Sequence, residues 1–153
     1  MIHIVLFEPE IPPNTGNLIR LCANMGASLH LIEPLGFSLE AKQLRRSGLD
    51  YHDMTRVHTY TDLPDFLARH PCNRLWVVET GGSQRYDQVQ FQAGDGLVFG
   101  PETRGLKDEQ LALLSSPVIS LPMTPNNRSL NLSNCASIVA FEAWRQLGFS
   151  GCA

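Results

Sequence analysis

Short apolar segments alternate with stretches of helical periodicity along this chain of 153 residues. The apolar segments are brief and rich in β-branched residues, which predicts strands, and apolar residues between them recur at spacings of three and four, which predicts helices. We expect strands at residues 2–7, 28–32, 56–60, 74–78, 96–99 and 118–121, and helices at 14–25, 40–46, 62–69, 107–114 and 131–147. This order is typical of a parallel sheet with helices on both faces, a three-layer α/β fold. We find no linker or internal repeat, so we predict a single domain spanning residues 1–153.

The first predicted helix combines an apolar face with an unusual polar face. We expect Asn14 to cap its start and Gly26 to end it. The residues expected to face the core are Leu18, Leu21, Cys22 and Met25. On the opposite face Arg20 lies between Asn17 and Asn24 at helical spacing. An arginine flanked by two asparagines is not typical of surface ion pairs, which favours a role in ligand binding.

The last predicted helix is apolar on nearly all sides. One stripe consists of Leu132, Ala136, Val139, Ala143 and Leu147, and it is widened by Cys135, Ile138, Phe141 and Trp144. A terminal helix on a small sheet should keep one polar face toward water. We therefore predict that a second subunit covers this helix in a homodimer, and we expect Val139 to lie at that interface.

Composition excludes several classes of protein. The formal net charge of −3 gives no overall electrostatic attraction for nucleic acid, so any anion site must come from local clustering. The cysteines form no C-x-x-C pair, which indicates a reduced, cytosolic protein. The five histidines are scattered without metal-ligand spacing, so we expect no metal. No apolar run approaches the roughly 20 residues of a membrane helix.

Basic residues are concentrated in one predicted helix, at Lys42, Arg45 and Arg46, with His52 nearby. Such a cluster can contact phosphates. The alternative is an ordinary solvated helix face, and the cluster alone does not decide between them.

Three loops of unusual composition each follow a predicted strand and lead into a predicted helix. They are PPNTGNLIR at residues 12–20, FGPETRGL at 99–106 and PMTPNNRSLNLS at 122–133. In open α/β sheets ligands bind at the carboxyl ends of the strands, so we expect the three loops to form one composite site. Each also carries an arginine: Arg20, Arg104 and Arg128. The glycine signature of dinucleotide folds, a Walker A loop and a G-x-S-x-G elbow are all missing from the sequence.

These three segments resemble the signature motifs of the SPOUT RNA methyltransferases, in the SpoU branch. The segments EPEIPPNTGN, RLCANMG, LRRSGLDYHD and EAWRQLG are similar to the stand-alone members that methylate the ribose 2′-oxygen of the cytidine or uridine at the tRNA wobble position. The resemblance covers nearly the whole chain. The chain departs from the family pattern at Gly81, where relatives often carry Lys, and at Phe141, where relatives often carry Tyr.

The resemblance implies a C-terminal trefoil knot, a homodimer, a cytoplasmic location and S-adenosylmethionine as cofactor. By position, the family's cofactor contacts correspond to Val78, Gly100, Leu121 and Ser129. Arg20 corresponds to the residue that activates the ribose hydroxyl, and Arg128 could clamp a phosphate as a second catalytic group. The residues expected to contact the tRNA anticodon arm are Asn17, Lys42, Arg45, Arg46 and Asn131.

The expected reaction is therefore 2′-O-methylation of the wobble nucleotide, with leucine tRNAs as the expected substrates. Two alternatives stay open. One is the same chemistry on another RNA, either ribosomal RNA or a different tRNA position. The other is an RNA-binding factor that has the fold without the activity.

Overall fold

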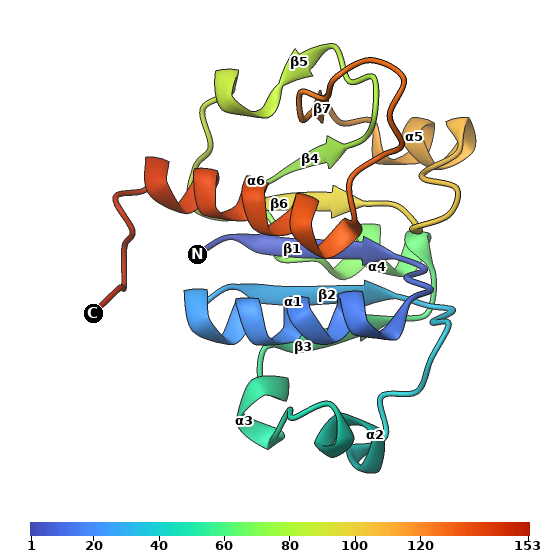
Figure 1. Ribbon diagram of the computed structural model, residues 1–153, viewed down its shortest axis with the longest axis vertical. Coiled ribbons are helices and arrows are strands. Elements are labelled where there is room, and N and C mark those ends of the chain that lie inside the picture. Colours follow the sequence, from blue (N-terminus) through green and yellow to red (C-terminus); the bar gives the residue numbers. More distant parts are fainter.

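Strands of this chain form one parallel sheet with helices packed on both of its faces (Figure 1). The computed structural model describes residues 1–40 and 42–153. Seven strands of the described chain lie in the order β3-β2-β1-β6-β4-β7-β5, and every strand pairing is parallel. The strands are β1 (His3–Phe7), β2 (Ser28–Ile32), β3 (Val57–Tyr60), β4 (Arg74–Val78), β5 (Gln84–Arg85), β6 (Asp95–Phe99) and β7 (Val118–Ser120). The predicted parallel α/β architecture is confirmed.

Helices form two layers around the sheet. They are α1 (Pro12–Met25), α2 (Ala41–Arg46), α3 (Tyr51–Met54), α4 (Leu63–Arg69), α5 (Asp108–Leu114) and α6 (Leu132–Gln146), with a short 3-10 helix at Tyr86–Gln88. One core cluster joins α1 and α6 to the sheet, and the other joins α4 and α5 to the opposite face. Within the described residues, no helix combines the length and the apolar character that spanning a membrane requires.

Alternate residues of the central strands enter the two core clusters. On β1, Ile4 and Leu6 belong to the cluster beneath α1 and α6, whereas Val5 and Phe7 belong to the cluster beneath α4 and α5. Burial on both faces explains why β1 is apolar in a continuous run rather than in alternation.

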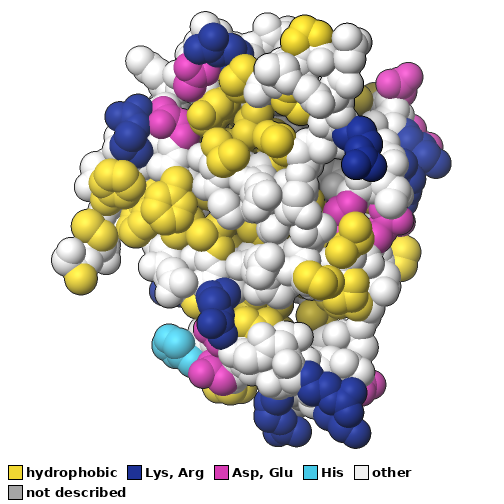
Figure 2. Space-filling model, viewed as in Figure 1, with side chains coloured by type: hydrophobic (Ala, Val, Ile, Leu, Met, Phe, Trp, Pro, Cys, Tyr) yellow, Lys and Arg dark blue, Asp and Glu magenta, His cyan; other side chains and the backbone are white. Residues whose placement is uncertain are grey.

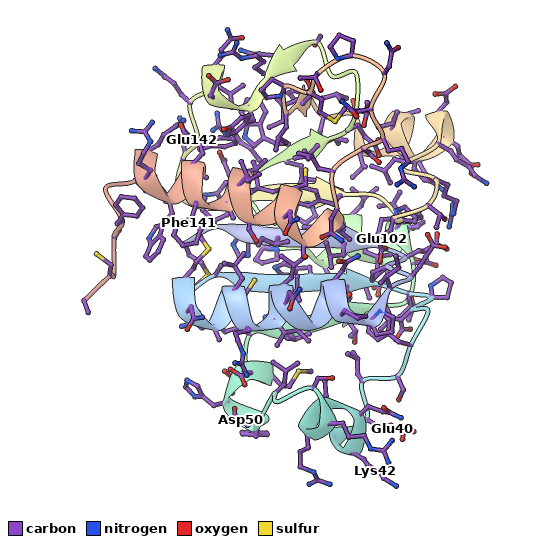
Figure 3. The ribbon with its side chains drawn as sticks, in the orientation of Figure 1. Glu40, Lys42, Asp50, Glu102, Phe141 and Glu142 are labelled. Carbon is purple, nitrogen blue, oxygen red and sulfur yellow. The ribbon has the colours of Figure 1, made fainter. Side chains whose placement is uncertain are left out.

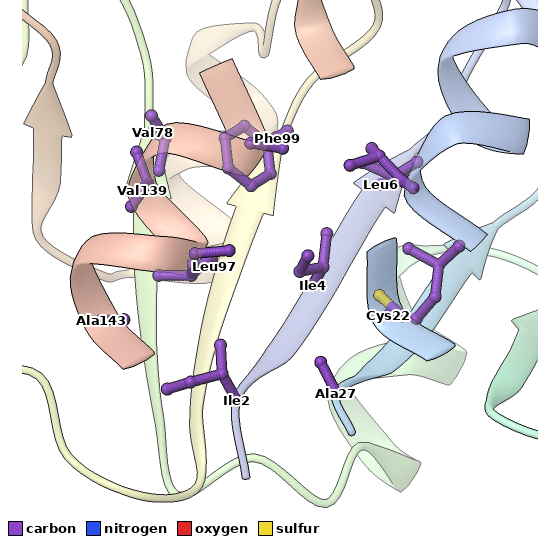
Figure 4. Packing of buried hydrophobic residues seen from close by; sticks show 14 of the residues in the cluster. Ile2, Ile4, Leu6, Cys22, Ala27, Val78, Leu97, Phe99, Val139 and Ala143 are labelled. Carbon is purple, nitrogen blue, oxygen red and sulfur yellow. The ribbon is translucent and has the colours of Figure 1, made fainter. Parts of the chain in front are cut away.

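The helix α6 packs its small residues directly onto the sheet (Figure 4). Val139 and Ala143 are fully buried and lie over Leu97 of β6. The expectation that Val139 lies at a subunit interface is therefore wrong, because its side chain belongs to the core of the single chain. The exposed apolar residues of α6 are Ile138 and Phe141, at 41% and 45% of their surface.

The start of α1 differs from the sequence-based expectation. α1 begins at Pro12, so Asn14 lies inside its first turn instead of capping it, and it is buried. Proline fits the first turn of a helix because it has no N–H to leave unpaired there. Gly26 ends the helix as predicted, in the left-handed conformation with φ of 72°.

The short elements α3 and β5 and the 3-10 helix were not predicted.

Candidate functional site

The loops that follow β1 and β6 are tied together at the carboxyl edge of the sheet. The carboxylate of Glu102 accepts hydrogen bonds from the backbone N–H groups of Glu10 and Ile11, at 2.9 and 2.6 Å. Ile11 precedes the first turn of α1 and offers no side-chain cap, so Glu102 satisfies amide groups that would otherwise be unpaired. Figure 3 places Glu102 beside the start of α1.

The same two loops are joined by a second set of hydrogen bonds, in which the loop after β6 donates and the loop after β1 accepts. Glu10 accepts hydrogen bonds from the hydroxyl and the backbone N–H of Thr103, at 2.8 and 3.1 Å. These bonds lower the pKa of Glu10, because both favour its charged form. Arg104 contributes a weaker ion pair with Glu8 at 3.4 Å. The segment that leads into α1 and the second predicted loop therefore form one hydrogen-bonded unit. The prediction of a loop at residues 12–20 is wrong, because these residues lie within α1.

Asn14 connects this unit to the third loop. Its side-chain oxygen accepts a hydrogen bond from the amide of Asn131 at 3.0 Å, and its own amide donates to Glu102 at 3.3 Å. Asn131 in turn caps α6 by accepting from the backbone N–H groups of Ser133 and Asn134. Sequence reasoning missed both the cap from Glu102 and the bridging role of Asn14, because each depends on a partner about 90 or more residues away.

A cavity of about 320 Å³ opens between the second and third loops. Its walls are the ends of β4 and β6 and the first turn of α6, together with the two loops. All four residues expected to bind the cofactor line it: Val78, Gly100, Leu121 and Ser129. Apolar side chains make up much of the remaining wall, including those of Phe99, Met123, Leu130 and Leu132.

Two glycines shape the loop that forms one side of the cavity. A Cβ atom on Gly100 would lie 2.6 Å from the backbone nitrogen of Leu106, which is too close for any side chain. Gly105 has a φ of +63°, in the left-handed region that favours glycine. The loop therefore folds back tightly on itself and exposes its backbone toward the cavity.

Glu79 is an acidic residue in the cavity wall that the sequence analysis did not single out. Its carboxylate accepts a hydrogen bond of 2.6 Å from the backbone N–H of Leu106 and lies against Gly105. Partial burial raises the pKa of Glu79, since desolvation penalises its charged form. No motif marks this position, although a charged residue directly after a buried strand could have drawn attention to it.

The predicted catalytic arginines lie outside the described cavity wall. Arg20 is exposed on α1, and its guanidinium donates a hydrogen bond of 2.5 Å to the carbonyl of Gly48, in the turn that follows α2. Arg128 is exposed in the third loop. Asn17 is exposed one turn before Arg20 and reaches the hydroxyl of Ser133 at 3.5 Å. A single chain thus brings together the predicted cofactor residues but not the predicted catalytic residues.

The predicted phosphate-contacting residues lie on α2. Lys42, Arg45 and Arg46 are all exposed. Figure 2 shows Lys and Arg side chains gathered at the end of the molecule that α2 forms, on the same face as α1 and α6. The cluster exists as predicted, and its solvent exposure leaves it available to a ligand.

Comparison with known proteins places the chain among RNA-modifying enzymes. The model of the SpoU rRNA Methylase family matches residues 1–141. The tRNA (cytidine(34)-2′-O)-methyltransferase of Saccharophagus degradans is 55% identical over 152 residues, with 99% of each chain covered. The protein of the same name from Escherichia coli K12 is 54% identical, with coverage of 99% of this chain and 97% of that one. A solved structure concerned with 2-OH methylation of C/U34 on tRNA has a TM-score of 0.87 and 40% identity, with 97% of each chain covered.

Proposed function

The chain belongs to the SpoU rRNA methylase family, and on that premise we propose that it methylates the ribose 2′-oxygen of cytidine or uridine 34 in tRNA. The observation that carries this proposal is the cavity formed by two of the three motif loops and linked through Asn14 to the third. The relatives named for this reaction match the chain over 99% of its length. Leucine tRNAs are the expected substrates.

The cavity fits S-adenosylmethionine as the methyl donor. Apolar residues at the strand ends can enclose an adenine, and the exposed backbone around Gly100 and Gly105 can hydrogen-bond to its polar edges. We assign Val78, Gly100, Leu121 and Ser129 to holding the cofactor. The cofactor supplies an electrophilic methyl group on a positively charged sulfur.

Arg20 is the residue that we assign to activating the ribose hydroxyl. A guanidinium is always protonated in proteins and carries only donors, so it is unsuited to act as a base. It can instead polarise the 2′-oxygen and hold the neighbouring phosphate, which accepts the proton. Arg128 is assigned to bidentate binding of a phosphate. Orienting the oxygen in line with the methyl group is the main contribution that the protein must make.

A homodimer would bring Arg20 to the cavity, since Arg20 lies outside the cavity wall of its own chain. The surface that supports a dimer is the exposed part of α6, where Ile138 and Phe141 keep 41% and 45% of their surface accessible. Figure 2 shows apolar side chains over this region. We propose that this face packs against the polar face of α1 in a second copy, and that the chain has the trefoil knot of its family.

The tRNA would then cross the face that carries α2. Lys42, Arg45 and Arg46 would contact phosphates of the anticodon arm, while Asn17 and Asn131 would contact the target nucleotide. Phosphate contacts position the RNA without reading its sequence. This division of roles suits a protein with a net charge of −3, because local basic residues supply the attraction that the whole molecule lacks.

The test uses the purified protein with S-adenosylmethionine labelled in its methyl group, a panel of tRNA transcripts and, separately, ribosomal RNA. We expect label on the 2′-oxygen of nucleotide 34, located by mass spectrometry of nuclease fragments. A synthetic anticodon arm with 2′-deoxyribose at position 34 is the matched control and should accept no label. Label at another nucleotide or in ribosomal RNA would support the alternative substrates. Cofactor and tRNA binding without transfer would support a non-catalytic RNA-binding factor.

A further inference from the structure

Four of the five histidines gather on the sheet face that α4 covers, together with a cysteine. His3, His30 and His58 occupy neighbouring strands β1, β2 and β3, and His58 is the register partner of His30. His70 follows α4, and Cys72 lies two residues before β4. The expectation of scattered histidines is therefore wrong in three dimensions, because parallel strands align positions that are about 30 residues apart.

Three of these side chains are buried and close to one another. The Nδ1 atom of His3 lies 3.0 Å from the Nε2 atom of His30. The donor atoms of His3, His30 and Cys72 all lie within 4.8 Å of one another, and the three residues are 7%, 1% and 9% exposed. Tetrahedral zinc, with bonds of about 2.0 Å to nitrogen and 2.3 Å to sulfur, needs donor atoms about 3.3–3.6 Å apart. Shifts of about 1 Å would bring these three atoms to that spacing.

A hydroxyl group next to His30 completes the arrangement. The Oη atom of Tyr60 lies 2.8 Å from the Nδ1 atom of His30, on the far side of the ring from His3. If Nδ1 carries the ring hydrogen and donates it to Tyr60, the lone pair of Nε2 points toward His3 and Cys72. Histidine ligands to metals commonly donate their second ring nitrogen in this way, which fixes the tautomer and the ring orientation.

We infer that His3, His30 and Cys72 form a binding site for Zn²⁺, with water in the fourth position. Imidazole nitrogen and cysteine thiolate are both ordinary ligands of zinc. On binding, the Cys72 thiol loses its proton to solvent, and each histidine keeps a single ring hydrogen on the nitrogen that faces away from the metal. The site lies toward the amino ends of the strands, whereas the methyl-transfer cavity lies at their carboxyl ends. Its role is therefore structural, linking β1 and β2 to the segment that enters β4.

The test is a titration of the full-length protein, freed of metal by chelation, with Co²⁺ as a spectroscopic probe. We expect one equivalent of Co²⁺ to give the near-ultraviolet absorption of a cobalt–thiolate bond and the visible bands of four-coordinate cobalt. One equivalent of Zn²⁺ should displace it and raise the melting temperature. Cys72→Ser should abolish the thiolate absorption, while Cys152→Ser, which alters the exposed cysteine of the tail, should preserve it.

A second variant keeps the inference open to refutation should Cys72→Ser fail to fold. His3→Asn retains a polar side chain at the start of β1, and it should weaken Co²⁺ binding by more than the roughly 10–100-fold that loss of an outer hydrogen-bond partner costs, because it removes a ligand. Circular dichroism of both variants reports whether they are folded. Parent protein that binds no Co²⁺ at millimolar concentration, or a thiolate band that persists in Cys72→Ser, would overturn the inference. The cluster would then be a hydrogen-bonded part of the core and nothing more.

Discussion

The side-chain amide of Asn131 donates a hydrogen bond of 3.0 Å to the side-chain oxygen of Asn14, a residue 117 positions earlier in the chain. Through this bond the loop that precedes α6 is held against the first turn of α1. Asn14 also donates to Glu102, so one buried amide of α1 contacts both of the other motif segments. The shape of the cavity therefore depends on a residue that does not line it in the described structure.

Asn14→Ala should reduce both stability and cofactor affinity. Losing the amide removes the two side-chain bonds and leaves the amide of Asn131 without its acceptor, at a cost of about 1–3 kcal/mol. Denaturant unfolding measures the first effect, and calorimetric titration with S-adenosylmethionine measures the second. Asn24→Ala is the matched control, since this exposed asparagine lies on the same helix. Equal losses in the two variants would show that Asn14 does not organise the site.

Arg20→Ala should lower the rate of methyl transfer by about 10²–10³-fold, the usual effect of removing one donor that stabilises developing negative charge. Cofactor affinity should stay nearly unchanged, because we assign Arg20 to the ribose of the tRNA and not to the cofactor. Single-turnover kinetics and cofactor titration separate the two effects. Arg20→Lys keeps the charge but loses the planar guanidinium, so it should recover only part of the rate. A large fall in cofactor affinity would assign Arg20 to cofactor binding or to structure instead.

Phe141→Glu should convert the proposed dimer to a folded monomer and abolish activity. The substitution places a charge on an exposed apolar surface of α6 without disturbing the core. Light scattering measures the mass, and circular dichroism checks the fold. Val139→Glu should instead unfold the chain, because it buries an unpaired charge in a protein whose total stability is about 5–15 kcal/mol. A monomeric parent protein at micromolar concentration would contradict the proposed dimer.

Replacing two arginines of α2, Arg45→Ala with Arg46→Ala, should weaken tRNA binding and flatten its salt dependence. Each lost phosphate contact lowers the slope of log affinity against log salt by about one unit, so the pair should lower it by about two. The fold should be retained, since both side chains are exposed. Lys107→Ala, another exposed cation, is the control. Coinciding slopes for parent and variant would identify the α2 cluster as an ordinary solvated face.

Glu79→Gln should change how stability depends on pH. The folded protein holds the pKa of Glu79 above its ordinary value of 4.5, so below 4.5 the carboxyl is protonated in both the folded and unfolded states. As pH rises through the raised pKa, the unfolded chain ionises first and the folded state loses stability. The unfolding free energy of the parent relative to Glu79→Gln should therefore fall as pH rises above 4.5 and through the raised pKa of Glu79. Denaturant unfolding of both proteins at a series of pH values measures this difference in unfolding free energy. A difference that rises with pH would contradict the raised pKa of Glu79.

The sequence by itself determined the parallel sheet and its two helical layers. Burial on both faces requires continuous apolar strands such as residues 3–7, and amphipathic spacing requires helices between them, so both signals are local. The family resemblance implied the cofactor residues Val78, Gly100, Leu121 and Ser129, and the structure brings all four to one cavity. Local sequence predicted only that the loops after the strands meet at one edge of the sheet.

Only the tertiary structure decided which distant residues touch. Glu102 caps a helix about 90 positions away, Asn14 is a bridge rather than a cap, and Val139 faces the core rather than a partner. His3, His30 and Cys72 show no spacing typical of metal ligands and yet share one buried cluster. The physical reason is common to the three polar cases. Local sequence fixes which face of a helix or strand is apolar, but the order of strands in the sheet fixes which polar groups are brought within hydrogen-bonding or coordinating distance.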